Sequence, residues 1–386
     1  MKKILYICCG NFQKKIIKTI KKKGFQIYGI DERVNAESKN LVDKFYNFKI
    51  QETKKIFSKL KKIQFSAIIS LNSDVGFNCA NNLSKLFNLE FLNTKKKDIF
   101  FKKNKLNIFL KKNKFPYKKF FYGNFLQYKN NYIYKPNSNS GSRGIFITPK
   151  KKFKNFLTTA KKFSIDDKVF CQEIINGKEF AFDCLVYNNE IIDFIISEKI
   201  KVKNIRYVSQ TILLSSINKN EREKFYNLIK KFFKKIKINQ GIFHFELIRD
   251  INSNLFIIDV APRGPGFFVL ENYLNNISSR NWIIDYLDII TNKFNKEKFK
   301  SFNKKPHLIH FILKKNGTFK YIKVRKNNLK YKITYFVKNN TQTIYSQNDS
   351  NRIASIIIKN KNSKKLLKDL QVIKKSFIAK YTNENY

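Results

Sequence analysis

The sequence predicts an α/β domain with a parallel, Rossmann-like sheet, followed by an α+β domain and a small β-rich domain at the C-terminus. Apolar strands alternate with amphipathic helices over residues 1–93, which is typical of parallel βαβ units with helices on both faces of the sheet. From residue 132 successive strands dominate, and residues 301–386 combine short strands with a terminal helix. We therefore expect three domains, at 1–93, 94–300 and 301–386.

The first domain is expected to contain five strands and three helices. Apolar runs place strands at 3–9, 25–30, 45–48, 65–70 and 90–92, and helical periodicity places helices at 12–23, 53–62 and 76–87. Gly10 follows the first strand and Asp31 follows the second, as in dinucleotide-binding sheets, but the glycine triplet of such sites is missing. The sequence therefore disfavours a nicotinamide site.

The second domain is expected to begin with a basic helical segment at 94–120. Antiparallel strands are predicted at 132–135, 144–148, 169–173, 179–186, 190–197, 241–248 and 255–260, with helices at 151–163 and 219–236. The last two of these strands are separated by a short polar turn and should form a β-hairpin. The third domain should be β-rich and end in a helix near 363–375.

The composition does not by itself indicate a nucleic-acid or membrane partner, although the formal net charge is +51. Only nine of the 79 basic residues are arginine, and the lysines are spread along the whole chain. Asn, Ile and Phe share A/T-rich codons with lysine, so genome bias explains the composition better than a charged partner. The apolar runs are too short for a membrane span or signal peptide, and the five cysteines lack metal spacing. We expect a cytoplasmic protein.

The predicted hairpin carries one carboxylate on each strand. A turn centred on Asn252 and Ser253 places Glu246 directly opposite Asp259, with Cβ atoms about 4.5–5.5 Å apart. Two carboxylates this close repel each other unless a cation lies between them. Because Mg²⁺ and other hard divalent ions bind oxygen ligands, the hairpin predicts a metal site formed by Glu246 and Asp259.

Two further stretches contain residue types that suit nucleotide binding. Lys135 ends a strand, and the small polar residues 137–144 after it could surround an anion with N–H groups and hydroxyls. A plain surface turn is the alternative interpretation. Gln172 and Glu173 end another strand, where a polar edge suits adenine, and the carboxylate of Glu179 suits a ribose diol. An ordinary hairpin with exposed acids would also explain this second stretch.

Taken in order, these three stretches resemble the ATP-grasp superfamily. The resemblance covers about residues 1–300 and rests on the lysine with its glycine loop, the pattern Gln-Glu-x-x-x-Gly-x-Glu at 172–179, and Glu246 followed by Asp259-Val-Ala-Pro-Arg-Gly-Pro-Gly266. The N-terminal α/β unit resembles the domain that precedes the ATP-grasp domain in that superfamily. The chain is most similar to carboxylate–amine ligases and carbamoyl-phosphate-synthase-like members.

The resemblance implies roles for residues at matching positions. Those expected to contact ATP are Lys103, Lys135, Ser140, Gly141, Ser142, Gly144, Gln172, Glu173, Ile175 and Glu179. The two lysines would bind phosphates, with Lys105 as the alternative to Lys103, and the serine–glycine loop would close over them. Residues 172–175 would line the adenine and the last carboxylate would bind the ribose. Glu246 and Asp259 would hold Mg²⁺, with Mn²⁺ as the alternative metal.

Arg263 and Lys135 are the residues to which the resemblance gives a catalytic role. Arg263 would neutralise charge developing on the transferred phosphoryl group, and Lys135 would bind the α- and β-phosphates of ATP. Many relatives carry Glu at the position of Asp259 and Asn at the position of Ala261. Aspartate still binds Mg²⁺, so we expect altered coordination of a second metal ion more than a loss of activity. His244 lies on the same strand face as Glu246, and both a substrate contact and a structural role remain open.

The implied reaction joins a carboxylate to an amine through an acylphosphate, with Mg-ATP converted to ADP and phosphate. The expected partners are ATP and small-molecule carboxylates and amines, without a specific nucleic acid or membrane, and a homodimer is one expected assembly. Relatives place the acceptor pocket near 263–268 and 200–215, so Arg206 and Ser209 are candidates. A nucleotide-binding protein that has lost catalysis is the alternative, supported by Ala261, and a basic nucleic-acid-binding module is a third hypothesis.

Overall fold

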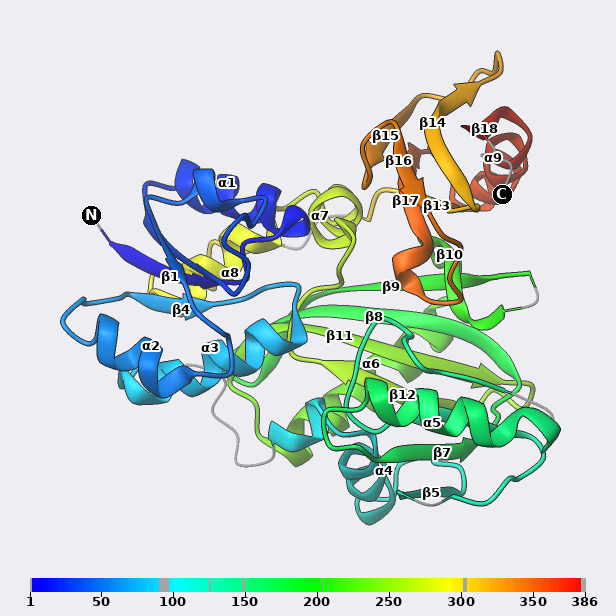
Figure 1. Ribbon diagram of the computed structural model, residues 1–386, viewed down its shortest axis with the longest axis horizontal. Helices are drawn as coiled ribbons and strands as arrows, with labels where there is room; N and C mark the ends of the chain where they lie inside the picture. The colour runs from blue at the N-terminus through cyan, green and yellow to red at the C-terminus, as the bar shows by residue number, and fades with distance from the viewer. Residues whose placement is uncertain are drawn as a thin grey trace.

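The computed structural model describes residues 2–89, 97–124, 126–147, 150–203, 205–300 and 304–382 (Figure 1). The N-terminal part is a parallel sheet with the strand order β3-β2-β1-β4. Its strands are β1 (Lys3–Ile7), β2 (Gln26–Asp31), β3 (Lys44–Asn47) and β4 (Ala67–Ile69). The predicted parallel sheet is therefore confirmed, and the strand expected at 90–92 lies outside the described residues.

Three helices cover this first sheet on its two faces, as the βαβ rhythm predicts. They are α1 (Lys14–Lys22), α2 (Thr53–Leu60) and α3 (Asp74–Leu86). Leu5 and Ile7 belong to one apolar cluster with α2 and α3, whereas Ile4 and Tyr6 belong to a second cluster with α1. Successive side chains of β1 thus point to opposite, buried faces, as expected for a strand of a parallel sheet.

The next part contains the helix α4 (Lys103–Lys112) and a three-stranded antiparallel sheet with α5 (Phe153–Phe163) against it. The sheet order is β5 (Phe120–Gly123), β7 (Val169–Glu173) and β6 (Tyr132–Pro136). The strand predicted at 144–148 is wrong, since residues 144–147 make only an isolated bridge between Tyr134 and Phe146. Left-handed backbone at Gly141, Ser142 and Gly144 makes a loop of the preceding segment. The helical segment expected at 94–120 is likewise shorter, because α4 ends at Lys112 and irregular chain leads from there to β5.

An eight-stranded sheet with the order β12-β11-β8-β9-β10-β13-β17-β15 runs through the rest of the molecule. Its first five strands are β8 (Gly177–Tyr187), β9 (Glu190–Val202), β10 (Ile205–Leu214), β11 (Gln240–Asp250) and β12 (Leu255–Ala261). The helix α6 (Lys219–Ile236) packs Phe225, Ile229 and Phe232 against this sheet, which buries all three side chains. The sequence interpretation missed β10, which links this part to the C-terminal segment.

The C-terminal segment continues the same sheet, because β13 (His307–Leu313) pairs with β10 and with β17 (Arg352–Lys359), and β15 (Tyr331–Tyr335) pairs with β17. A small second sheet contains β14 (Gly317–Val324), β16 (Thr341–Thr343) and β18 (Phe377–Thr382). The predicted terminal helix is α9 (Ser363–Ser376). Figure 1 shows this segment in orange and red, rising from the central sheet beside the blue N-terminal part.

Between the central sheet and the C-terminal segment, the chain forms a π-helix at Val269–Leu274, then α7 (Asn275–Ser278) and α8 (Trp282–Ile290). Helix α8 is packed against α1 and joins the N-terminal sheet to the central one. Every helix in the described ranges is too short or too polar to cross a membrane. The observed architecture is thus a parallel α/β unit followed by antiparallel sheets, as the sequence predicts.

Candidate functional site

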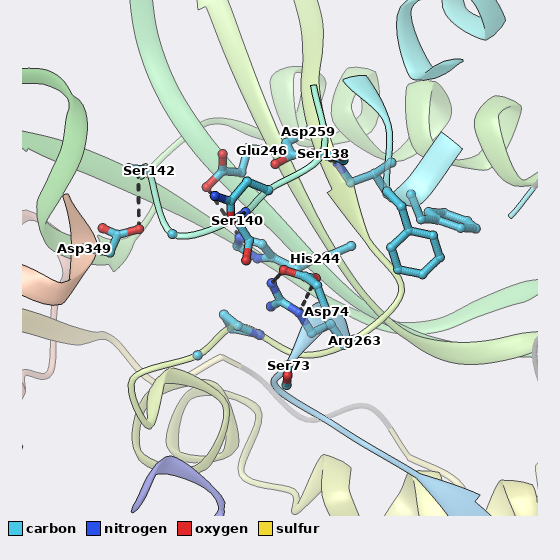
Figure 2. A pocket seen from close by; sticks show the side chains of 18 of the residues that line it. Ser73, Asp74, Ser138, Ser140, Ser142, His244, Glu246, Asp259, Arg263 and Asp349 are labelled. Atoms are coloured by element: carbon cyan, nitrogen blue, oxygen red, sulfur yellow. Dashed lines mark hydrogen bonds and ion pairs between the residues drawn. The ribbon is translucent and has the colours of Figure 1, made fainter. Parts of the chain in front are cut away.

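A cavity of about 770 Å³ lies where the three parts of the chain meet. Its lining includes Asp74 from the N-terminal part, Glu246 and Asp259 from the central sheet, and Asp349 from the C-terminal segment (Figure 2). Most of the polar residues that the sequence singled out line this cavity. These are Lys103, Lys135, Ser140, Gly141, Ser142, Ser209, His244, Glu246, Asp259 and Arg263.

The two hairpin carboxylates face each other as predicted, since Glu246 on β11 is paired with Asp259 on β12. The turn, however, is not centred on Asn252 and Ser253. Near the turn Leu247 pairs with Ile257, which centres the loop on Asn252. Between this pair and the pair of Glu246 and Asp259, β12 contains one extra residue, a β-bulge, which shifts the register by one. The bulge at Ile258 compensates for the different turn, so the pairing is right although the predicted turn is wrong.

Glu246 is surrounded by cationic groups. The Lys199 ammonium lies 2.5 Å from the Oε1 atom of Glu246, and the Nε2 atom of His244 lies 3.7 Å from the same oxygen. Burial alone would raise the pKa of Glu246, but Lys199 and His244 outweigh it and hold that pKa well below its usual range. Glu246 therefore carries its negative charge inside the cavity.

His244 is held by a second carboxylate. Its Nδ1 atom lies 2.7 Å from the Oδ1 atom of Asp183, which is almost completely buried on β8. Burial would lower the pKa of His244, but Asp183 and Glu246 outweigh it and raise this pKa to about 9. The imidazole is therefore cationic at neutral pH and lines the cavity beside Glu246.

Asp259 shows the opposite balance, because burial and the charges of Glu246 and Asp74 raise its pKa above the ordinary value. This crowding of carboxylates is relieved when a cation binds between them. No group of three or more His, Cys, Asp or Glu residues with metal-ligand spacing occurs in the described ranges, so the site offers two carboxylates. Mg²⁺ in nucleotide sites usually binds one or two carboxylates together with phosphates and waters. The residues present therefore fit Mg²⁺ bound jointly by Glu246, Asp259 and a nucleotide.

Two lysines supply positive charge near these acids. Lys135 lies on β6 and lines the cavity, and burial together with the neighbouring ammonium of Lys103 lowers its pKa. Lys103 is the first residue of α4, and its Nζ atom donates to the carbonyl of Asn139 at 2.9 Å. Lys105 is exposed and does not line the cavity. Of the two alternatives, only Lys103 is therefore in a position to contact an anion in the cavity.

The first residues of the loop after Lys135 are held by hydrogen bonds, and the residues that follow them line the cavity. Asp166 accepts hydrogen bonds from the amide of Asn137 at 2.7 Å and from the hydroxyl of Ser138 at 2.9 Å. Ser140, Gly141 and Ser142 line the cavity, whereas Gly144 does not. Gly144 has a φ of +69°, and a Cβ atom there would lie 2.9 Å from the ring of Pro136, so glycine is required for structural reasons.

Arg263 is bound by a carboxylate from the N-terminal part. Its Nε and Nη2 atoms donate to the two oxygens of Asp74 at 2.6 and 2.7 Å, as the dashed lines in Figure 2 show. Burial would raise the pKa of Asp74, but Arg263 outweighs it and lowers this pKa below the ordinary value. The pair therefore links α3 to the loop after β12 with a geometry that suits two parallel hydrogen bonds.

The residues expected to contact adenine and ribose do not line the cavity. Gln172 is buried and donates to the side chain of Asn107 at 3.0 Å, and Glu173 accepts a hydrogen bond from the hydroxyl of Tyr132. The carboxylate of Glu179 lies 2.7 Å from Lys199 and 2.5 Å from Lys201. The predicted roles of these residues, and of Ile175, therefore remain predictions.

Sequence reasoning missed several residues that line the cavity. Asp74 had a recognisable signal, because Ser73 caps α3 and an acid in the first helical turn follows it. Lys199 and the C-terminal residues Asp349 and Arg352 had none, because their position depends on sheet register and on the packing of the C-terminal segment. Ser209 lines the cavity as expected, while the side chain of Arg206 lies outside the described part of the chain.

Comparisons with known proteins agree with this arrangement. Residues 128–269 match the family model of the ATP-grasp domain. No curated protein is similar enough in sequence to count as a relative. The matched residues contain the lysine strand, the serine–glycine loop, both hairpin carboxylates and Arg263.

Solved structures with the same fold cover nearly the whole chain. An L-amino acid ligase from Bacillus licheniformis has a TM-score of 0.86 at 14% identity, with 99% of each chain covered. A phosphoribosylglycinamide synthetase from Anaerococcus prevotii has a TM-score of 0.75 at 19% identity, with 99% of this chain and 100% of that chain covered.

A third similar structure contains nucleotide. The biotin carboxylase domain of a 2-oxoglutarate carboxylase from Hydrogenobacter thermophilus, in complex with MgADP and bicarbonate, has a TM-score of 0.74 at 15% identity and covers 99% of this chain and 91% of that chain. At these identities the similarity shows the fold and not the reaction. Residues 128–269 thus match an ATP-grasp domain, and the chain as a whole shares the fold of these three enzymes.

Proposed function

We propose that this protein is an ATP-dependent ligase that joins a carboxylate to an amine through an acylphosphate. The observation that carries this proposal is the joint placement of a carboxylate pair, two lysines and an arginine around one cavity of the ATP-grasp fold. The carboxylate pair is Glu246 and Asp259, and the cations are Lys103, Lys135 and Arg263. Such a set suits a triphosphate with its metal ion and a developing phosphoryl charge.

In the proposed reaction, an oxygen of the substrate carboxylate attacks the γ-phosphorus of ATP, and the bond to the β,γ-bridging oxygen breaks, which releases ADP. The amine nitrogen then attacks the acyl carbon, phosphate leaves, and the nitrogen loses a proton. Lys135 and Lys103 would hold the phosphates, and Arg263 would stabilise the transferred group. Mg²⁺ bound by Glu246 and Asp259 would supply further charge neutralisation on the phosphates.

The remaining assignments belong to the same proposal. The loop of Ser140, Gly141, Ser142 and Gly144 would close over the phosphates and exclude water from the acylphosphate. Residues 172–175 would line the adenine, and Glu179 would bind the ribose after exchanging one of its two lysine partners for the sugar. A cytoplasmic setting, where Mg-ATP is abundant, and a homodimer are further parts of the proposal.

The substrates are the open part of the proposal, and the similar structures suggest where to begin. One of them is named for a ligase of L-amino acids, so amino acids are the first amines and acids to test. ADP release by the purified protein should be measured with Mg-ATP, and then with Mn-ATP, against pairs of amino acids, small peptides and other carboxylates. Hydroxylamine added in place of the amine should trap the acylphosphate as a hydroxamate.

The metal assignment is tested with two neutral variants, Glu246→Gln and Asp259→Asn. Each should lower kcat by about 10²–10³-fold, since each removes a charge that supports the transferred group. The exposed Glu297→Gln variant is the matched control and should behave as wild type. Full turnover in both site variants would contradict the proposal. Mg-ADP binding without any ADP release or hydroxamate would instead identify a nucleotide-binding protein that does not ligate.

A further inference from the structure

The C-terminal segment places a buried arginine, Arg352, in the wall of the cavity. Arg352 is the first residue of β17, and its side chain is only 7% exposed although it lines the cavity. Its Nη2 atom donates to the carbonyl of Ser209 at 2.8 Å and to Asp349 at 2.6 Å. The first bond joins the guanidinium to β10 and the second joins it to the turn just before β17, so Arg352 has a defined position.

Two aromatic rings fix the plane of the same group. The guanidinium carbon lies 4.6 Å from the ring centroid of Phe267 and 4.0 Å from that of Phe311. Such stacking orients an arginine and leaves its edge available for hydrogen bonds in the plane of the group. Phe267 follows Arg263 by four residues, so Arg352 borders the loop that carries Arg263.

The hydrogen-bonding capacity of Arg352 is only partly used. A guanidinium has five N–H groups, and the two bonds described above both leave from Nη2. The Nε atom is buried and has no partner in the described part of the chain. A buried N–H without an acceptor is unfavourable, so the contacts within the described chain leave the hydrogen-bonding capacity of this buried guanidinium unsatisfied.

The charge of Arg352 is also incompletely balanced. Asp349 is its one ion-pair partner among the described residues, and that carboxylate also accepts a hydrogen bond from the hydroxyl of Ser142 at 3.3 Å (Figure 2). Arg263, by contrast, donates to both oxygens of Asp74. Burial lowers the pKa of Arg352, and the negative charges of Asp349 and Glu246 oppose that effect. A further anion in the cavity would therefore be attracted to Arg352.

Arg352 and the lysines that would hold the phosphates reach the cavity from different elements. Lys135 belongs to β6 and Lys103 begins α4, whereas Arg352 begins β17 and is bonded to β10. The cavity wall thus carries two groups of cations, the lysine pair and Arg352. The first suits the triphosphate, and the second is left for another anionic group.

We propose that Arg352 binds a carboxylate of the substrate that does not take part in the reaction. A planar carboxylate matches the in-plane hydrogen bonds of a stacked guanidinium. This inference rests on the proposed ligase reaction and names a substrate class for it. The bound group belongs either to the amine, which is then an amino acid or short peptide, or to the acid, which is then a dicarboxylate.

The test compares substrates with and without that carboxylate. In the amine arm, ADP release is measured with L-amino acids and with the corresponding amino-acid amides. In the acid arm, succinate and glutarate are compared with their monoamides. Wild type should prefer the charged member of one pair by about 10–100-fold in kcat/KM, which is the expected effect of a hydrogen bond to a charged group. The arm that shows the preference identifies the substrate that carries the carboxylate.

Three variants test whether Arg352 is responsible. In Arg352→Gln the preference should fall to a few-fold, and Arg352→Lys should restore part of it, because lysine keeps the charge but not the planar fork. Arg325→Gln removes an exposed arginine of the same segment and should keep the wild-type preference. A rise in Tm with Mg-ADP shows that each variant is folded around the nucleotide site.

The outcomes separate this inference from the proposed function. ADP release with equal use of charged and neutral members in both arms would overturn the role of Arg352 and leave the ligase proposal standing. The same holds if Arg352→Gln, still folded, keeps the wild-type preference. If wild type releases no ADP with any pair, the ligase proposal fails, and calorimetry with alanine, alaninamide, succinate and succinamate then decides whether Arg352 binds a carboxylate.

Discussion

The contact between Asp74 and Arg263 shows how single residues from distant parts of the sequence complete the cavity. Asp74 begins α3 of the N-terminal part, and Arg263 lies in the loop after β12. Two short hydrogen bonds fix the guanidinium, and the side chains are only 20% and 13% exposed. At this burial the pair is weakly screened by solvent, so its geometry is well defined. Asp74 therefore has the geometry of a positioning residue for Arg263.

Replacing Asp74 by Asn tests this positioning role, because asparagine keeps the shape but removes the charge. We expect kcat for ADP release to fall by about 10²-fold, since a small misplacement of a group at the reacting phosphoryl has that effect. KM for ATP should change much less. The measurement is steady-state kinetics with the substrate pair found in the ligase screen. Glu32→Gln, an exposed acid of the same part, is the control. An unchanged kcat would contradict the positioning role, and a higher kcat would show that Asp74 restrains Arg263 instead.

At the scale of elements, β-bulges explain what sequence reasoning could and could not predict. Residue types and strand order were enough to predict the parallel sheet, the hairpin and the facing positions of Glu246 and Asp259. The register of the hairpin was not predictable, because a bulge at Ile258 compensates for a different turn. The hairpin of β8 and β9 is a second example. The pairing next to its turn, if it continued unchanged along both strands, would place Glu179 opposite Glu198. A bulge near Leu185 shifts the register, so that Glu179 lies opposite Lys199 instead.

The serine–glycine loop offers a prediction at the same scale. Gly141 and Gly144 have nearly equal φ angles of +71° and +69°, but a Cβ atom at Gly144 would meet Pro136 and Phe163 within 3.0 Å, and one at Gly141 would meet nothing within 4 Å. Both Gly→Ala variants should lose about 1–2 kcal/mol through backbone strain. Gly144→Ala should lose a further 1–3 kcal/mol or so through overpacking.

Urea unfolding of both glycine variants measures this difference directly. Because the backbone strain is matched, the excess loss in Gly144→Ala reports the contact with Pro136 and Phe163 alone. Equal losses would mean that the loop can move away from α5 without cost, and the tight base of the loop would then have no structural importance.

At the scale of the whole molecule, the sequence suggested a separate C-terminal domain, and the structure shows a shared sheet and shared cores. Strand β10 pairs with β13, and between these two strands the hydroxyl oxygen of Thr211 lies 2.8 Å from the Nδ1 atom of His310. Leu213 of β10 belongs to the same apolar cluster as Leu366 of α9. Phe311 of β13 belongs to the cluster that contains Trp282. Such long-range pairing leaves no local signal in the sequence, which is why β10 and its role were missed.

The shared sheet predicts that the C-terminal segment and the rest of the chain unfold together. Trp282 is the one tryptophan of the sequence, it is completely buried, and its indole N–H donates to Asp193 at 3.0 Å. Trp282 precedes the C-terminal segment but shares an apolar cluster with Phe311 of β13, so its fluorescence reports on the core that joins the two parts. Leu366→Ala removes a fully buried side chain of α9 and should cost about 2–5 kcal/mol. The neighbouring Leu367 is 51% exposed, so Leu367→Ala should cost less than about 0.5 kcal/mol.

Urea unfolding followed by both Trp282 fluorescence and far-ultraviolet circular dichroism distinguishes joint unfolding of the whole chain from independent unfolding of the C-terminal segment. If the sheet couples the parts, Leu366→Ala moves both transitions to the same lower midpoint, and Leu367→Ala moves neither. An independent C-terminal domain would instead give two transitions by circular dichroism, with the Trp282 midpoint unchanged in Leu366→Ala. Coupling of this kind would also hold Asp349 and Arg352 in the wall of the cavity, because separation of β13 and β17 from the rest of the sheet would remove both residues from that wall.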